Sequence, residues 1–321
     1  MKNSEMPGAY RTIIDLEREL GLETDENKAE KAGYCQWSIL PNGVYVPAQN
    51  TIKRLDAGLY EIKYNSGLGS YTMIQQKLNA DELFFLPSEE IDGVIDDVRK
   101  FWSSIDIFKT YKFAHKRGIL LYGEPGCGKS CIIQLCMKHI VEEMDGIVIN
   151  VKDEDDVENY ISFIANFRQV EPNRPLIVIM EDIDAIMGDD RYSTSRVLNI
   201  LDGIKQIENV VYIATTNYPE KLEERVTNRP SRFDRRYKVE LPNSEMRKAY
   251  FEHKIPTEDL SKIDIETWVK DSYGMSLAHL REVVISTIVL GNTYEDTMER
   301  LKALKKAPKV KGGNSIGFGS V

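Results

Sequence analysis

Short apolar runs alternate with amphipathic segments through the middle of the chain. From residue 118 onward, the runs GILLYG, GIVINV, LIVIM and VVYIATTN have the length and composition of buried strands. The segments between them, residues 129–144, 155–170 and 194–206, repeat apolar side chains at helical spacing. Continuous apolar strands that alternate with helices predict a parallel sheet covered on both faces, and therefore an α/β fold.

The pattern differs on either side of this central region. Toward the N-terminus, YCQWSIL and VYVPA flank a Pro-Asn-Gly turn, while LYEIKYN and YTMIQQ flank SGLGS, so two hairpins are predicted. Residues 88–110 then become helical in pattern. After Leu241 only helical patterns remain, at about 243–254, 264–271, 276–290 and 294–306.

These changes in pattern predict four parts of the chain. Residues 1–88 would form a small β-rich N-terminal domain that binds a client or partner, and residues 89–241 the large α/β domain with its leading helix. Residues 242–307 would form a small helical lid domain. Residues 308–321, rich in Pro, Gly and Lys, would be a flexible tail.

Composition narrows the class of protein. The chain of 321 residues is 42% hydrophobic and 29% charged, without an apolar run of about 18 residues or a signal-peptide core, so we expect no membrane span. Three of its four cysteines, Cys127, Cys131 and Cys136, crowd one segment without zinc-site spacing and do not form a disulfide framework, so we expect a reducing compartment and hence a cytoplasmic location. A net charge of −9 argues weakly against broad nucleic-acid binding.

The segment GEPGCGKS matches the phosphate-binding pattern GxxxxGK[ST] between a predicted strand and a predicted helix. Glycines let backbone N–H groups face a phosphate, and the helix N-terminus adds positive potential. Lys129 would reach the β- and γ-phosphates, and Ser130 would bind Mg²⁺. The alternative is a glycine-rich turn without a ligand. The predicted cofactors are ATP and Mg²⁺, and the predicted nucleotide-binding residues are Gly123, Glu124, Pro125, Gly126, Cys127, Gly128, Lys129, Ser130 and Cys131.

Three acids follow the apolar run LIVIM, namely Glu181, Asp182 and Asp184. Carboxylates this close repel one another unless a cation lies beside them, and a nucleotide-bound Mg²⁺ is the cation expected here. Glu181 at the strand end would serve the metal, and Asp182 would orient and polarise a water molecule. The alternative is a solvated acidic turn.

Three segments together resemble AAA+ ATPases of the AAA clade, from about Ile91 to Val289. RGILLYGEPGCGKS resembles that clade's Walker A segment, LIVIMEDIDAI its Walker B segment, and VVYIATTNYPEKLEERVTNRPSRFDRRYKVELP its second region of homology. The Glu-Asp order departs from the usual Asp-Glu order of the clade. This order and the segments GCGKS and LNILDG resemble those of the branch that contains the mitochondrial ATPase assembling respiratory complex III. The resemblance implies a parallel-sheet P-loop domain followed by a small helical domain.

The resemblance also implies roles for single residues. Asn217 corresponds to sensor 1, a polar group beside the attacking water or γ-phosphate, although it could also be only a turn residue before Pro219. Arg229 and Arg232 in RPSRFD match paired arginine fingers that act on a neighbouring subunit's ATP, the alternative being a solvated basic loop. Ala278 takes the position of the second sensor.

The fingers imply a ring of identical subunits, most simply a hexamer with ATP at its interfaces. Members of the clade that thread proteins through the ring carry an aromatic loop at the position where this chain has the acidic stretch NVKDEDDVENYISF. Tyr160 lies within this stretch, and its place in the helical pattern predicts a core residue. The expected function is Mg·ATP-dependent remodelling or translocation of a macromolecular client, with protein favoured. A nucleic-acid remodeller or loader and a nucleotide-gated scaffold with little hydrolysis are the alternatives. Short members of this kind resemble phage-encoded ones, in which case the location would be the host cytoplasm.

Overall fold

The computed structural model describes residues 36–39, 45–48, 51–67, 69–77, 89–188, 191–202, 207–222 and 232–306. The chain divides into two compact units, residues 1–55 and 56–321. In the first unit, β1 (Gln36–Ile39) and β2 (Tyr45–Ala48) pair antiparallel, as the first predicted hairpin requires. Its Pro-Asn-Gly turn and the tail 308–321 lie outside the described residues.

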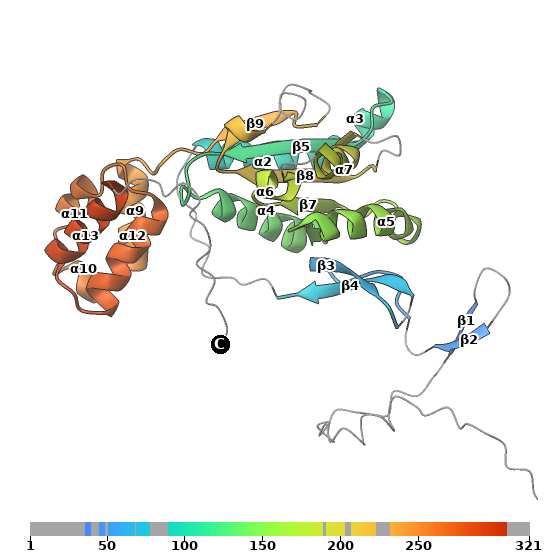
Figure 1. The fold of residues 1–321 in the computed structure, drawn as a ribbon, viewed down its shortest axis with the longest axis horizontal. Coiled ribbons are helices and arrows are strands. Elements are labelled where there is room, and N and C mark those ends of the chain that lie inside the picture. Colours follow the sequence, from blue (N-terminus) through green and yellow to red (C-terminus); the bar gives the residue numbers. More distant parts are fainter. Residues whose placement is uncertain are drawn as a thin grey trace, which may run out of the picture. The chain divides into compact units, whose positions relative to one another are not determined.

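The second unit is built on one seven-stranded sheet (Figure 1). The strands run in the order β4-β3-β6-β7-β8-β5-β9, and every neighbouring pair is parallel except β3 with β4. This confirms the α/β prediction. The strands are β3 (Gly58–Asn65), β4 (Ser70–Gln76), β5 (Lys116–Tyr122), β6 (Ile147–Asn150), β7 (Leu176–Met180), β8 (Val210–Thr216) and β9 (Arg235–Lys238).

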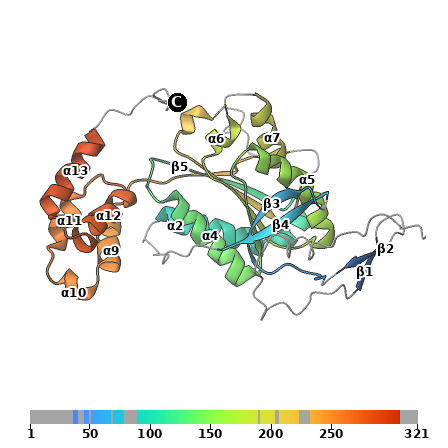
Figure 2. The same cartoon turned by 60° about the horizontal axis from the view of Figure 1, so that its bottom comes forward.

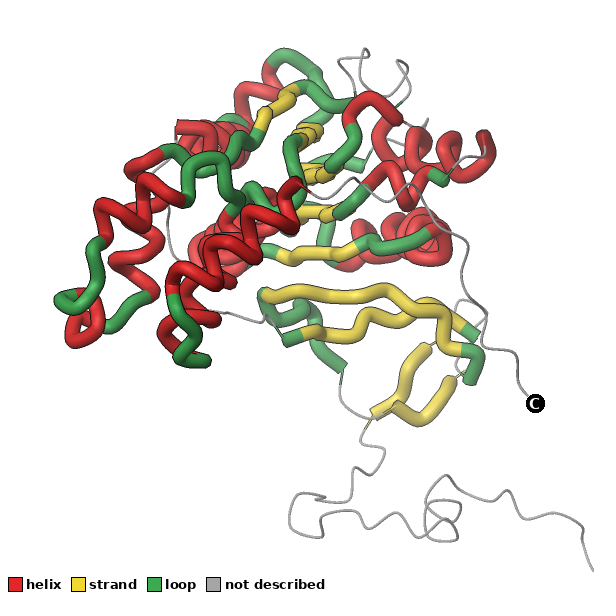
Figure 3. The backbone as a smooth tube through the Cα atoms, turned by 60° about the vertical axis from the view of Figure 1, so that its left-hand side comes forward, coloured by secondary structure: helices red, strands yellow, loops and turns green. Residues whose placement is uncertain are grey.

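Helices cover both faces of this sheet (Figure 3). Ile132 and Ile140 of α4 share one apolar cluster with α2 and with alternate strand residues such as Ile177. On the opposite face the Tyr160 hydroxyl of α5 lies 3.2 Å from the Tyr212 hydroxyl of β8. These helices are α2 (Glu89–Ser103), α3 (Ile105–Thr110), α4 (Lys129–Met144), α5 (Glu154–Val170), α6 (Ile183–Met187), α7 (Arg191–Asp202) and the 3₁₀ turn η1 (Pro219–Lys221).

The second predicted hairpin belongs to this sheet rather than to a separate N-terminal domain. β3 pairs with β6 in parallel, with Gly58 opposite Ile147, and β4 then pairs with β3. Tyr60 and Ile62 are buried, and the Asn159 side chain of α5 donates to the carbonyl oxygen of Ile62. The structure thus differs from the boundary expected near residue 88, because β3 covers the open backbone edge that β6 would otherwise present.

Strand β9 and helix α6 were not predicted. β9 pairs with β5, with Ile119 opposite Arg235, and carries the polar sequence RRYK. Three of its four side chains are exposed, so it has neither an apolar run nor an alternating pattern. Such an edge strand is specified by backbone pairing with β5 rather than by its own side chains.

The remaining helices form a bundle after β9 (Figure 2). Asn243, Asp264 and Ser276 each accept a backbone N–H at the start of a helix, as N-cap side chains do. The bundle packs around Phe251 and Leu280, both fully buried. Its members are α9 (Ser244–Lys254), α10 (Thr257–Leu260), α11 (Ile265–Asp271), α12 (Leu277–Val284), the π turn η2 (Ile285–Val289) and α13 (Tyr294–Lys306). Among the described residues, none of the helices has the length and hydropathy to cross a bilayer.

Candidate active site

The loop between β5 and α4 is the first part of the site. It connects Tyr122, the last residue of β5, to Lys129, the first residue of α4. Gly126 and Gly128 have φ angles of +74° and +113°, in a region that side chains with a Cβ rarely adopt. The loop ends at the helix N-terminus, where free backbone N–H groups and the helix dipole favour an anion.

The Lys129 ammonium lies between this loop and the end of β8. It donates to the carbonyl oxygens of Gly123 (2.8 Å) and Glu124 (3.0 Å) and to Oδ1 of Asn217 (2.6 Å). Lys129 is buried, and these three acceptors are neutral. A buried cation favours an anion nearby, so the surroundings of Lys129 suit a bound phosphate.

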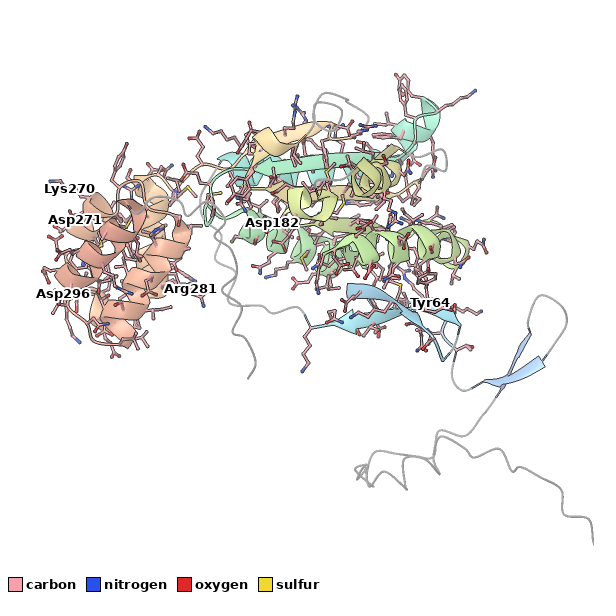
Figure 4. All side chains as sticks on the ribbon, in the orientation of Figure 1. Tyr64, Asp182, Lys270, Asp271, Arg281 and Asp296 are labelled. Atoms are coloured by element: carbon pink, nitrogen blue, oxygen red, sulfur yellow. The ribbon has the colours of Figure 1, made fainter. Side chains whose placement is uncertain are left out.

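The two acids at the end of β7 have different partners. Ser130 Oγ donates to Oε2 of Glu181 at 2.7 Å, whereas Asn217 Nδ2 donates to Oδ1 of Asp182 at 2.9 Å. Lys129, Asn217 and Asp182 therefore form one hydrogen-bonded chain, and Ser130 with Glu181 forms a separate pair. Met180 is the last residue of β7, and Glu181 and Asp182 follow it in turn. Asp182 is labelled in Figure 4.

The Ser130–Glu181 pair offers the oxygen ligands that Mg²⁺ prefers. No group of three or more His, Cys, Asp or Glu side chains that could hold a metal occurs among the described residues. A Mg²⁺ at this pair would therefore take its other ligands from phosphate oxygens and water, which is how Mg²⁺ is commonly held on nucleotides.

Two threonines at the end of β8 form hydrogen bonds with the acidic segment that follows β7. Thr215 Oγ1 accepts the N–H of Asp182, whose φ of +48° is left-handed. Thr216 Oγ1 donates to Oδ1 of Asp184 at 2.6 Å and accepts the N–H of Tyr218. Asp184 was grouped with the site acids from the sequence, but neither threonine was. The only signal for them is their place directly before Asn217.

The helical bundle contacts the phosphate loop. A Cβ on Gly126 would lie 2.8 Å from Ser276 Oγ and 3.0 Å from the Ala278 Cβ, so the small residue expected at position 278 fits a close approach. Beside the loop is a small cavity of about 90 Å³, lined by apolar residues such as Ile91, Val239 and Leu277 and by the polar residues Glu240 and Asn243.

Two predicted nucleotide-binding cysteines also line this cavity. Cys127 is buried and Cys131 is half-buried, and neither forms a disulfide. Burial raises the pKa of the Cys131 thiol, so its neutral form is favoured. Cys131 is therefore a small, weakly polar group in the lining of this cavity.

Of the two predicted arginine fingers, the structure describes only Arg232. Arg229 lies outside the described residues. Arg232 is only 7% exposed, and its backbone lies against Gly118 of β5, where an added Cβ would meet the Arg232 carbonyl oxygen at 1.7 Å. A guanidinium buried in its own subunit is poorly placed to reach a neighbour. Arg232 therefore stays a predicted finger whose observed surroundings favour a structural role.

Tyr160 is 1% exposed, as predicted for a core residue. Its burial and the contact with Tyr212 raise its pKa well above the usual value. The acidic stretch before it forms the start of α5, with Asp153 as the N-cap and Glu154, Asp155 and Asp156 in the first turn. The helix dipole stabilises acidic side chains in the first turn of a helix. The acidic composition of this stretch is therefore explained by its place at the start of α5.

Residues 119–241 match the family model described as "ATPase family associated with various cellular activities (AAA)". The chain carries an AAA ATPase domain. The matched range begins in β5 and ends after β9, so it contains the phosphate loop, both acids and Asn217. The predicted AAA+ ATPase fold is thereby confirmed for this part of the chain.

The chain is also similar to known proteins over much of its length. The chain is 28% identical over 258 residues to the 26S proteasome regulatory subunit S10B homolog B of Arabidopsis thaliana, covering 70% of this chain and 63% of that protein. It is 26% identical over 267 residues to the proteasome-activating nucleotidase of Methanothermobacter thermautotrophicus, covering 72% and 63%. It is 28% identical over 220 residues to the ATP-dependent zinc metalloprotease FtsH 1 of Conexibacter woesei, covering 63% and 33%. The chain thus spans less than two thirds of each of these relatives.

Proposed function

We propose that this protein is a Mg·ATP-dependent ATPase that forms a ring and uses hydrolysis to remodel or translocate a protein client. The observation that carries the proposal is the division of partners at the end of β7: Glu181 pairs with Ser130, and Asp182 pairs with Asn217. One acid thus lies where a nucleotide-bound cation would be held, and the other lies where a water molecule would be oriented.

In this proposal each side chain has one task. Lys129 and the backbone of the loop 123–128 would bind the β- and γ-phosphates, and Ser130 with Glu181 would hold Mg²⁺, which would neutralise phosphate charge. Asp182 accepts a hydrogen bond from the attacking water and polarises it, while Asn217 fixes the orientation of the Asp182 carboxylate. The Glu-Asp order places the shorter carboxylate toward the water, which favours slow hydrolysis. The same order supports our proposal that the chain is related to the branch that contains the complex III assembly ATPase.

Two further observations support the ring and the client. Arg229, whose sequence position lies between β8 and β9, is the proposed finger for a neighbouring subunit's ATP, and six subunits is the stoichiometry we favour. Two of the relatives are named for the proteasome and one as a metalloprotease, so a protein client is favoured for this chain as well. We place the protein in the cytoplasm, where its free thiols would stay reduced.

The alternatives are separated by two measurements. Phosphate release from ATP, with and without Mg²⁺, should show steady turnover; binding and assembly without release would favour the nucleotide-gated scaffold. A nucleic-acid loader would bind DNA or RNA with a strong salt dependence, which the charge of −9 does not favour. An Asp182→Asn ring expressed in the cells of origin should retain the client, and the co-purified molecule would show whether it is protein.

A further inference from the structure

A short helix near the start of the AAA domain has no buried residue. This helix, α3, and the turn after it carry three large apolar side chains in the open: Ile107 is 59% exposed, Tyr111 69% and Phe113 68%. Figure 1 shows α3 at the end of α2, beyond the strands of the sheet. Single exposed apolar residues are ordinary, but three within seven positions indicate a surface that another molecule covers.

The backbone holds these side chains outward. Lys112 has a φ of +57°, an unfavourable value for a residue with a Cβ, and the N–H of Phe113 donates to the carbonyl oxygen of Phe108. Phe108 itself packs edge-on against the ring of Phe101. The hydrogen bond to Phe108 and the packing of Phe108 against Phe101 hold the turn in place, while Tyr111 and Phe113 stay exposed. We call Ile107, Tyr111, Phe113, Lys109 and Lys112 the α3 surface.

A second exposed apolar pair lies in the helical bundle. Val289 is 72% exposed and Leu290 65%, at the C-terminal end of the π turn η2 that follows α12. The N–H of Leu290 donates to the carbonyl oxygen of Ile285, which closes that turn. π turns cost backbone stability and are often found at functional positions. Val289, Leu290 and the exposed acids Glu295 and Asp296 make up what we call the lid-turn surface; Figure 4 labels Asp296.

The two surfaces carry opposite charge. The segment 106–113 contains two lysines and one aspartate, and the segment 289–296 contains two acids and no basic residue. Asp106 offsets part of the Lys109 charge at 3.8 Å, so Lys112 supplies most of the net positive charge. Apolar centres with complementary charged rims are what two faces of one interface have.

We propose that the α3 surface of one copy of this chain binds the lid-turn surface of the next copy. The inference rests on the proposed ring and names the surfaces that would join its subunits. Because the two surfaces are different, the contact is head-to-tail, and repetition of a head-to-tail contact closes a ring if the rotation allows.

Two double variants test the surfaces separately. Tyr111→Ser/Phe113→Ser and Val289→Ser/Leu290→Ser should each weaken assembly by at least about tenfold, measured by sedimentation velocity with Mg·ATP, since buried interface anchors commonly contribute that much. Val170→Ser on α5, where the valine is 66% exposed, is the matched control and should assemble normally. Thermal melts followed by circular dichroism show whether each variant is folded.

Mixing the two double variants gives the sharpest result. The α3 variant keeps an intact lid-turn surface, and the lid-turn variant keeps an intact α3 surface, so one good contact can form between them. The mixture should give heterodimers that neither variant forms alone, and no rings. An interface that pairs identical surfaces would give no such dimers.

A charge exchange covers the case in which a serine variant fails to fold. Lys112→Glu should weaken assembly, and Glu295→Lys added to the same chain should restore it, because every contact then pairs the exchanged charges. If the wild type assembles while all these variants assemble equally well, the surfaces are misassigned and bind some other molecule. If the wild type stays monomeric with every nucleotide, the proposed ring itself fails.

Discussion

Asp182 combines a left-handed backbone with a side chain held by Asn217, so its carboxylate position is set from two directions. We expect Asp182→Asn to bind Mg·ATP and to lose hydrolysis by roughly 10²-fold or more, because an amide cannot draw a proton from water. Phosphate release and fluorescent-nucleotide binding measure the two properties. Retained hydrolysis would mean that another group activates the water.

Glu181 should behave differently because its partner is Ser130 rather than Asn217. Glu181→Gln is expected to raise the Mg²⁺ concentration needed for half-maximal activity, since an amide oxygen is a weaker ligand than a carboxylate. A Mg²⁺ titration of phosphate release checks this. If Glu181→Gln abolished turnover at saturating Mg²⁺ while Asp182→Asn shifted only the Mg²⁺ requirement, the two assignments would have to be exchanged.

Lys129→Ala should reduce ATP affinity by at least about tenfold, because the loop loses its side-chain cation and its link to Asn217. Equilibrium binding to a fluorescent ATP analogue is the measurement. Lys138→Ala, on the same helix but with an exposed side chain, is the control and should leave affinity unchanged. Near wild-type affinity in Lys129→Ala would contradict the phosphate-loop assignment.

At the scale of single elements, the close packing of β5 against the backbone of Arg232 requires a residue without a Cβ at position 118. Gly118→Ala would drive a methyl group into the Arg232 carbonyl oxygen, so we expect a loss of about 1–3 kcal/mol in the free energy of unfolding. Gly93→Ala in α2 is the matched change: its Cβ would lie 3.4 Å from Tyr237, an ordinary contact, and should stabilise by up to about 1 kcal/mol. Urea titrations compare the two; equal stabilities would mean that the β5–β9 edge shifts easily.

The elements also show what sequence reasoning could reach. LIVIM and the helix 129–144 were predicted with the observed bounds, because each buries its own apolar pattern. The pairing of β3 with β6 was missed, since an eight-residue hairpin strand looks the same whether it pairs locally or joins a distant strand. At the site, the motif residues were predicted, but Thr215 and Thr216 act through hydrogen bonds from the end of β8 to the segment after β7, which no local pattern encodes.

At the scale of the whole molecule, the finger residue is predicted to act in another subunit. Arg229→Ala should bind ATP normally but lose on the order of 10³-fold in kcat. Mixed with the inactive Asp182→Asn protein, it should regain activity, because roughly a quarter of the contacts in a random ring would join an intact water-activating site to an intact arginine. Phosphate release at several mixing ratios measures this, and no recovery despite proven subunit exchange would contradict a finger acting between subunits.

Arg232 needs a separate variant because it is buried. Arg232→Ala should lower the melting temperature, whereas Arg229→Ala should not, since removing a buried charged group leaves its partners unsatisfied. A finger role for Arg232 would instead give a normal melting temperature and a lost kcat.

The parallel pairing of β3 with β6 has a mechanical consequence. The chain enters the nucleotide-binding sheet at Gly58, in a strand that lies two places from β7, the strand that the two acids follow. Tension applied along β3 would load the β3–β6 hydrogen bonds in shear, where several must break together rather than one after another. Such a pull would strain the sheet that positions the proposed catalytic acids, and so load could alter the rate of ATP turnover directly.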